Sequence, residues 1–143
     1  MTRLQSPKKV LFLCTGNSCR SQMAEAIVNA RLSDRWRAFS AGTRPTGYVN
    51  PKAIAVLNEI GIDHQGRSKG TSYFSGDDFD LIVTVCDSAT EDCPVWLRSD
   101  PQVQMAFEDP AAFKGNEQEV LNKFRQVRDE ISIQIPGLLA RYE

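Results

Sequence analysis

The chain has 143 residues, of which 41% are hydrophobic and 24% charged, and its formal net charge is −1. These values predict one globular domain over residues 1–143, long enough to bury a core of its own. The net charge argues against a broad nucleic-acid surface, which needs an excess of basic residues. No apolar run approaches the roughly 20 residues that a membrane span needs.

The first predicted element is a buried strand over residues 9–13, which are apolar after Lys9. This run ends at Cys14 and is too short for the hydrophobic region of a signal peptide. We therefore expect a cytoplasmic protein, in which thiols stay reduced and the four cysteines form no disulfide scaffold.

Apolar spacing then predicts an amphipathic helix over residues 20–32 and, after a short strand at 38–40, a second helix over 51–60. Asn50 and Pro51 suit the N-cap and the first position of that helix, and Gly61 suits its end. The polar residues 67–76 are expected to be irregular, with room for one helical turn. His64 is expected on a surface loop.

A third strand is predicted at residues 80–85, which are dense in β-branched and apolar side chains, and a fourth at 104–107. The segment between them, residues 86–100, is expected to be a loop. The last helix is predicted from about residue 117 to residue 142, and Pro136 is expected to kink or shorten it.

Strands that alternate with helices predict an α/β domain with a four-stranded parallel sheet, flanked by helices on both faces. Ligands of such sheets bind beyond the carboxyl ends of the strands. Cys14, Cys86 and Asp109 each follow a predicted strand. We therefore expect these three residues to gather at one edge of the sheet.

Residues 14–21, Cys-Thr-Gly-Asn-Ser-Cys-Arg-Ser, join the first strand to the first helix and form a Cys-x5-Arg motif. Backbone N–H groups at the start of a helix bind anions, and Gly16 and Asn17 tolerate the positive φ of such a turn. The Arg20 guanidinium adds a bidentate cation. The predicted oxyanion-binding residues are Thr15, Gly16, Asn17, Ser18, Cys19, Arg20 and Ser21.

The same surroundings favour the Cys14 thiolate over the thiol, because a helix N-terminus and a guanidinium stabilise the anion. Ser21 could donate a further hydrogen bond to the sulfur. His64 is the only histidine and lies far from the motif in the sequence. We therefore predict a thiolate that attacks a tetrahedral oxyanion without a histidine base, and we expect Cys19 to pack rather than to react.

Two other kinds of site are disfavoured. Gly42 and Gly47 have the spacing of a nucleotide-binding loop, but Tyr48 follows them in place of lysine. The cysteine pairs lack the short spacing and the histidines of structural zinc sites, so no metal is expected.

With these motifs the chain resembles the low-molecular-weight protein tyrosine phosphatase family and, more narrowly, its thioredoxin-coupled arsenate reductases. The resemblance covers nearly the whole chain and rests on residues 14–25, 39–42, 50–54, 86–94, 107–110 and 124–130. Gln22 stands where the phosphatases usually carry proline, and Ala111 and Ala112 where they carry aromatic residues. The lack of an aromatic wall there favours a small inorganic anion over a phosphotyrosine ring.

The resemblance implies that arsenate is reduced to arsenite by a relay of three cysteines, in which Cys14 attacks arsenate, Cys86 attacks Cys14, and Cys93 attacks Cys86. It implies that Arg20 acts on the oxyanion and Asp109 as a general acid. Thioredoxin is the implied reductant, with a glutaredoxin or a low-molecular-weight thiol as alternatives. A phosphatase, an anion sensor and a redox buffer remain the competing functions.

Some members of the family bind potassium through residues that match Asn17, Glu25 and Ser40. Lys69 or Gly70 stands here where those proteins carry a further acidic ligand, and a lysine ammonium could replace the cation electrostatically. We therefore expect no potassium site and no other cofactor. The expected protein is a monomer that binds neither nucleic acid nor membrane.

Overall fold

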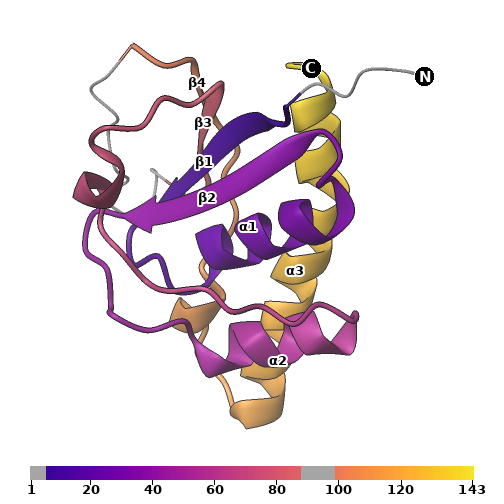
Figure 1. Cartoon of the computed structure of the whole chain (residues 1–143). Helices are drawn as coiled ribbons and strands as arrows, with labels where there is room; N and C mark the ends of the chain where they lie inside the picture. Colours follow the sequence, from indigo (N-terminus) through magenta and orange to yellow (C-terminus); the bar gives the residue numbers. More distant parts are fainter. Residues whose placement is uncertain (1–5, 88–98) are drawn as a thin grey trace.

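The computed structural model describes residues 6–87 and 99–143, which contain one parallel sheet (Figure 1). Its strands are β1 (Lys8–Cys14), β2 (Trp36–Gly42), β3 (Leu81–Thr84) and β4 (Gln102–Gln104). They lie in the order β2-β1-β3-β4, and every neighbouring pair is parallel. The predicted four-stranded parallel sheet is confirmed, and β1 lies in its interior.

The α-helices of the described residues are α1 (Arg20–Arg31), α2 (Pro51–Glu59) and α3 (Glu117–Ala140), and the short 3-10 helices are η1 (Thr71–Phe74) and η2 (Pro110–Ala112). The sequence specifies where α2 and α3 begin. The Asn50 side chain accepts a hydrogen bond from the Lys52 amide at 2.9 Å and caps α2. Asn116 and Glu119 form a capping box at the start of α3.

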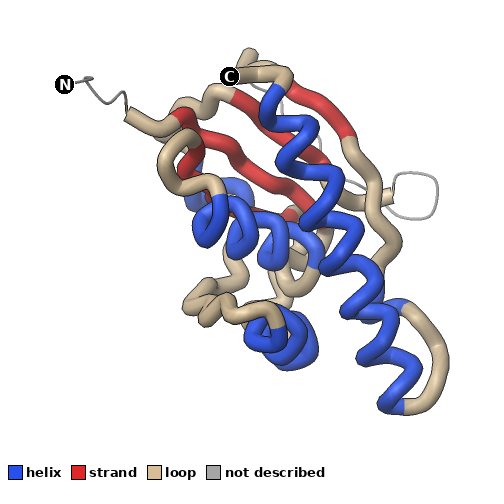
Figure 2. Tube along the Cα trace, turned by 90° about the vertical axis from the view of Figure 1, so that its right-hand side faces the viewer, coloured by secondary structure: helices blue, strands red, loops and turns tan. Residues whose placement is uncertain are grey.

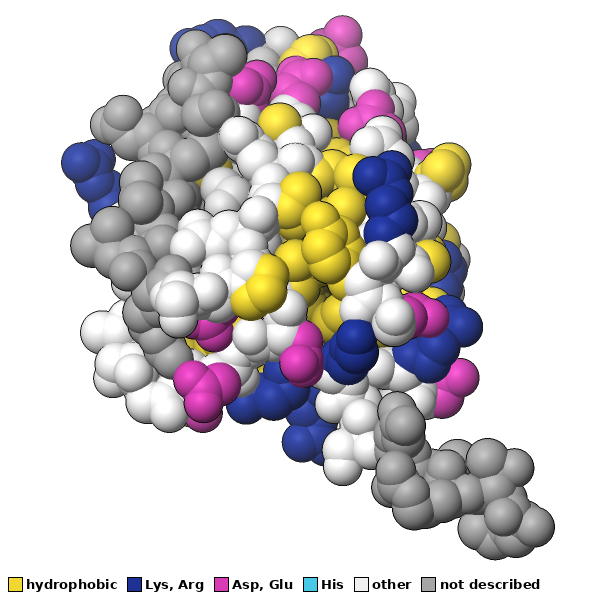
Figure 3. Space-filling model, turned by 90° about the horizontal axis from the view of Figure 1, so that it is seen from above, with side chains coloured by type: hydrophobic (Ala, Val, Ile, Leu, Met, Phe, Trp, Pro, Cys, Tyr) yellow, Lys and Arg dark blue, Asp and Glu magenta, His cyan; other side chains and the backbone are white. Residues whose placement is uncertain are grey.

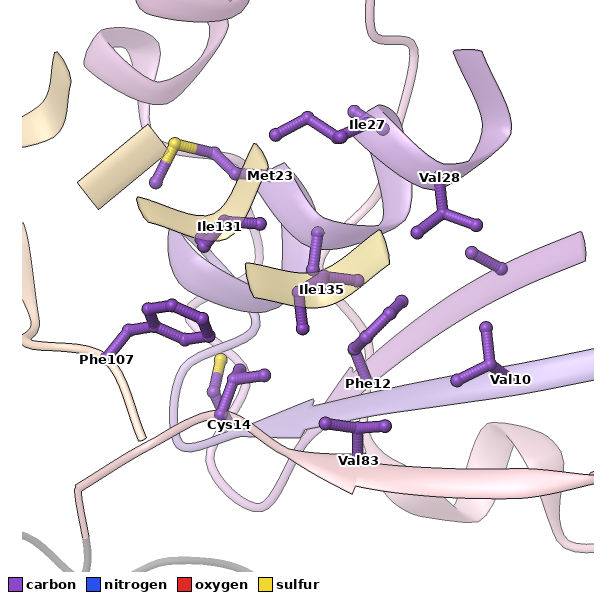
Figure 4. Packing of buried hydrophobic residues seen from close by; sticks show 14 of the residues in the cluster. Val10, Phe12, Cys14, Met23, Ile27, Val28, Val83, Phe107, Ile131 and Ile135 are labelled. Carbon is purple, nitrogen blue, oxygen red and sulfur yellow. The ribbon is translucent and has the colours of Figure 1, made fainter. Parts of the chain in front are cut away.

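The two faces of the sheet have different coverings. Helices α1 and α3 pack side by side on one face of the sheet (Figure 2). Phe12 and Cys14 of β1 point to this face (Figure 4). Leu13 points to the opposite face and belongs to a smaller cluster with Phe74 of η1. Because side chains alternate along a strand, β1 directs the Cys14 side chain toward the helical layer.

Two strands differ from the prediction in their limits. β2 is longer than residues 38–40, because the fully buried Trp36 already pairs with Lys8. β4 was predicted at 104–107, which is wrong: the register against β3 places Gln102 opposite Ile82 and ends the strand at Gln104. The backbone continues along β3 beyond that point, where the Phe107 amide donates to the Val85 carbonyl at 3.0 Å.

Pro136 does not end the last helix, which runs through it to Ala140. A proline removes one backbone hydrogen bond and crowds the preceding turn. Here Ile135, Leu138 and Leu139 are buried against the core on both sides of the proline. Tertiary packing therefore keeps the last turn helical.

The surface carries charges of both signs. Figure 3 shows basic and acidic side chains interspersed around an apolar band on one face of the molecule, in keeping with the net charge of −1. Among the described residues, every helix is too short or too polar to cross a bilayer.

Candidate active site

Hydrogen bonds from a neighbouring segment to the outer side of the loop between β1 and α1 hold this loop in place. The carbonyls of Thr15, Gly16 and Ser18 accept hydrogen bonds from the amides of Arg44 at 2.9 Å, Thr46 at 3.0 Å and Asn50 at 3.0 Å. In a trans peptide the carbonyl and the following N–H point in opposite directions. The amides of residues 16, 17 and 19 therefore point away from this outer segment, as an anion-binding loop requires.

Two residues allow the loop its shape. Asn17 is fully buried and has a φ of 49°, in the left-handed region that asparagine tolerates. Gly42, at the end of β2, lies directly against the loop, where a Cβ would come within 2.5 Å of the Thr15 carbonyl oxygen. A side chain at position 42 would therefore push the loop outward.

A small cavity of about 140 Å³ opens at the loop. Its lining residues are Cys14, Gly16, Ser18, Cys19, Arg20, Thr46, Tyr48, Asn50, Asp109 and Ala111. The structure thus brings together the predicted nucleophile, most of the predicted anion-binding loop and the predicted acid. Of the loop, Thr15, Asn17 and Ser21 lie outside this lining. Ser21 contacts the Cys14 sulfur, and Asn17 contacts Ser21.

Cys14 is buried, and its sulfur lies 2.9 Å from the Ser21 hydroxyl oxygen. The Asn17 side-chain amide donates to that same oxygen at 2.8 Å. When Cys14 is a thiolate it has no proton to give, so Ser21 is then the donor of this contact while it accepts from Asn17. A hydrogen bond donated to a thiolate stabilises it, and the role of Ser21 as that donor stays a prediction.

Arg20 and Asp109 lie together at the opening of the loop. Arg20 is almost fully buried, and its Nη1 donates to the Phe107 carbonyl at 3.1 Å. Its Nη2 lies 3.8 Å from Asp109 Oδ2. The other carboxylate oxygen of Asp109 accepts from the Ala111 amide at 3.0 Å and caps η2. Asp109 therefore has one oxygen fixed by the turn and the other beside the guanidinium.

Cys19 lines the same cavity but differs chemically from Cys14. Burial, followed by the charges of Asp109 and Cys14, raises the pKa of the Cys19 thiol to about 12. A thiol with this pKa stays protonated near neutral pH. That Cys19 has no catalytic role stays a prediction.

Cys86 follows β3 at the same edge of the sheet as Cys14. The Val85 amide donates to the Leu13 carbonyl at 2.8 Å, so the chain reaches Cys86 beside the end of β1. Cys14 and Cys86 are buried in the same hydrophobic cluster. Cys86 is disulfide-bonded, whereas Cys14 and Cys19 are free thiols. Cys93, the third predicted cysteine of the relay, lies outside the described residues.

The three potassium candidates are already engaged with groups of the protein. Asn17 Oδ1 accepts from the Lys69 amide at 2.9 Å, and the Ser40 hydroxyl donates to Glu25 Oε1 at 2.6 Å. The Lys69 ammonium lies 3.9 Å from the same Glu25 oxygen and donates to the Arg67 carbonyl at 2.8 Å. Burial lowers the pKa of Lys69, and the Glu25 charge opposes this shift. A lysine cation therefore lies beside the acidic candidate ligand.

Sequence reasoning missed two features of the site. His64, expected on a surface loop, is half-buried and its Nε2 lies 2.7 Å from Gln22 Oε1. Tyr48 lines the cavity and is 56% exposed, so an aromatic ring stands at the rim despite Ala111 and Ala112. Neither position carried a signal, because both contacts depend on how loops from distant parts of the chain fold together.

A strand-to-helix anion loop with a buried cysteine, a buried arginine and an aspartate at its opening defines a class: enzymes that use a thiolate on tetrahedral oxyanions. Residues 9–143 match the family model described as low molecular weight phosphotyrosine protein phosphatase. The chain belongs to this family.

Its relatives include reductases. An arsenate reductase of Halalkalibacterium halodurans is 43% identical over 129 residues, covering 90% of this chain and 92% of that protein. A solved arsenate reductase in a phosphate-binding state has a TM-score of 0.72 and 30% identity, with 95% of this chain and 99% of that chain covered. An arsenate reductase in an oxidized state has a TM-score of 0.76 at the same identity and the same coverage.

Proposed function

We propose that this protein reduces arsenate to arsenite through Cys14, Cys86 and Cys93. The observation that carries the proposal is the different state of its cysteines: Cys86 is disulfide-bonded while Cys14 and Cys19 are free. A phosphatase needs only the thiolate, the anion loop and the acid. A second, redox-active cysteine beside the end of β1 is what a reductase requires in addition. The arsenate reductases among its relatives support the same function.

In the first step the Cys14 thiolate attacks the arsenic of an arsenate ion held by the loop amides and Arg20. A sulfur–arsenic bond forms and an arsenic–oxygen bond breaks. Asp109, whose Oδ2 is next to the Arg20 guanidinium, gives a proton to the departing oxygen, which leaves as water. Arsenic stays pentavalent in this step.

Cys86 and Cys93 each attack as a thiolate after the thiol proton has passed to solvent. In the second step the Cys86 sulfur attacks the Cys14 sulfur. The sulfur–arsenic bond breaks, its electron pair stays on arsenic, and arsenic leaves as trivalent arsenite. The two sulfurs lose two electrons in total and form a Cys14–Cys86 disulfide. Cys93 then attacks Cys86, which releases the Cys14 thiolate and leaves a Cys86–Cys93 disulfide.

Disulfide mapping after one turnover tests this relay. The reduced protein is mixed with arsenate, quenched by alkylation and digested for mass spectrometry. We expect a predominant Cys86–Cys93 disulfide with Cys14 and Cys19 alkylated. Four alkylated thiols after incubation with arsenate would overturn the proposal.

We further propose that thioredoxin closes the cycle in the cytoplasm and that the enzyme acts as a monomer. A dithiol protein supplies the two electrons and two protons that the final disulfide needs. Steady consumption of reduced thioredoxin on addition of arsenate measures this coupling. It also separates the enzyme from an anion sensor, which would bind arsenate without consuming reductant.

The Lys69 ammonium leads us to propose that the enzyme does not depend on potassium. Its Nζ lies 3.9 Å from Glu25, and Asn17 Oδ1 is occupied by the Lys69 amide. Exchanging sodium for potassium at equal ionic strength should leave the thermal midpoint of the wild-type protein unchanged.

Lys69→Ala removes the ammonium group that lies beside the Glu25 carboxylate. We expect potassium to raise the midpoint of this variant by several degrees, since about 1 kcal/mol corresponds to roughly 2–4 °C in a domain of this size. Lys114→Ala, at an exposed position, is the control. A potassium response of equal size in the wild-type protein would contradict the proposal.

Hydrolysis of phosphomonoesters is the second candidate function. Tyr48 favours it, because an exposed ring at the rim of an oxyanion cavity can stack on an aryl leaving group. Cys14, Arg20 and Asp109 would serve this reaction equally well. The two functions differ in whether Cys86 is needed.

A further inference from the structure

A chain of hydrogen bonds runs from the half-buried His64 to the nucleophile. It passes from His64 to Gln22 at 2.7 Å, from Gln22 to Asn17 at 3.1 Å, from Asn17 to Ser21 at 2.8 Å and from Ser21 to the Cys14 sulfur at 2.9 Å. Gln22, Asn17 and Ser21 are all fully buried. Their polar atoms therefore have these partners in place of water.

The direction of each bond is fixed by the other bonds of the same group. Asn17 Oδ1 accepts from Gln22 Nε2 and from the Lys69 amide, so Asn17 Nδ2 is the atom that donates to Ser21. Gln22 Nε2 faces oxygen acceptors only, the Arg67 carbonyl at 2.7 Å and both oxygens of Asn17. Gln22 Oε1 must then accept, and His64 Nε2 must donate to it. Each step from His64 to Ser21 therefore donates toward Cys14, and Ser21 donates to the sulfur when Cys14 is a thiolate.

Gly66 makes room for the first step of this chain. A Cβ at position 66 would lie 2.2 Å from His64 Nε2 and 2.4 Å from Gln22 Oε1. The imidazole and the amide thus occupy the space that any other residue would fill. Burial lowers the pKa of His64 and so favours the neutral ring, whose Nε2–H donates the hydrogen bond that Gln22 Oε1 accepts.

We propose that His64 is a positioning residue for Cys14, acting through the orientation of Gln22 and Asn17. The proposal rests on the proposed function, since it gives Cys14 the role of nucleophile. His64 prevents the Gln22 amide from turning over, because a reversed amide would place its oxygen against the Arg67 and Asn17 oxygens. Asn17 Nδ2 then keeps donating to the Ser21 oxygen, and the Ser21 hydroxyl stays directed at the Cys14 thiolate. Aligned hydrogen bonds of this kind strengthen one another in a buried chain.

The pH profile of Cys14 alkylation by iodoacetamide tests this role without arsenate. Cys86 is disulfide-bonded and Cys19 stays protonated, so tandem mass spectrometry can follow Cys14 alone. In His64→Ala we expect the midpoint of the profile to rise by about 0.5 to 1 pH unit, a threefold to tenfold loss of thiolate. Gly66→Ala should shift it in the same direction, because its Cβ separates His64 from Gln22.

Two control variants separate positioning from general damage. His64→Gln retains a side-chain N–H donor and should restore most of the wild-type profile. Gln65→Ala, at an exposed neighbour that bonds Asp63 at 2.9 Å, should not shift the midpoint. The other titratable groups that line the cavity are unchanged in all four variants: Cys19, Arg20, Tyr48 and Asp109.

An unshifted profile in a folded His64→Ala protein would overturn the proposal. If His64→Ala does not fold, an unshifted alkylation profile in Gly66→Ala would overturn the proposal. A His64→Gln profile shifted as far as the Gly66→Ala profile would also overturn it. Failure of this proposal and failure of the proposed function give different results. If the wild-type protein does not reduce arsenate, the proposed function is wrong, but the alkylation profiles still test the role of His64.

Discussion

The Cys86→Ser variant is expected to form the arsenate adduct at most once and then stop, a loss of steady-state reduction below detection. Its Cys14, Arg20 and Asp109 are unchanged, so arsenate still enters the loop and the first step still proceeds. Serine cannot take up the two oxidising equivalents, because an alcohol oxygen forms no disulfide. The rate of arsenate reduction is measured through the consumption of reduced thioredoxin.

The same variant decides between the two candidate functions. Hydrolysis of p-nitrophenyl phosphate uses only the thiolate, the loop and the acid, so Cys86→Ser should retain it. Cys14→Ser should lose both reactions, since it removes the nucleophile common to them. Full arsenate turnover by Cys86→Ser would contradict the relay, and circular dichroism checks that this buried substitution leaves the fold intact.

Local sequence patterns were sufficient to predict most elements of the fold and the central loop of the candidate site. The apolar run of β1, the Asn50 cap and the spacing of α1 each indicated an element that the structure contains. The Cys-x5-Arg motif also defined a loop whose function depends on contiguous residues, so Cys14, Arg20 and Ser21 could be assigned roles. Features built from one stretch of chain were accessible because neighbouring residues determine them.

Features that depend on distant contacts were not accessible. The limits of β4 follow from its register against β3, which no local pattern encodes. His64 reaches Gln22 across 42 positions of sequence, and only because Gly66 leaves the space. Tyr48 joins the cavity through a loop whose amides bond the opposite side of the anion loop. In each case the packing of separate segments, and not residue type, creates the feature.

Arg20→Lys is expected to lower kcat/KM for arsenate by about 100- to 1000-fold, comparable to the loss of one oxyanion donor in other enzymes. The Arg20 guanidinium donates to the Phe107 carbonyl through Nη1 while Nη2 faces Asp109. This contact fixes the plane of the fork over the cavity. A lysine ammonium has the same charge but cannot hold the Phe107 carbonyl and present two parallel N–H groups to an oxyanion.

Arg128→Lys supplies the matched control. Arg128 is also buried, donates to the Val56 carbonyl at 2.9 Å and pairs with Glu59 at 2.8 Å, but it joins α2 to α3 and does not line the cavity. Both substitutions exchange a buried guanidinium for an ammonium, so both should lower the thermal midpoint. Only Arg20→Lys should also weaken the binding of sulfate, measured by calorimetry. Equal loss of sulfate affinity in the two variants would mean that stability, and not the geometry of the Arg20 fork, governs anion binding at this loop.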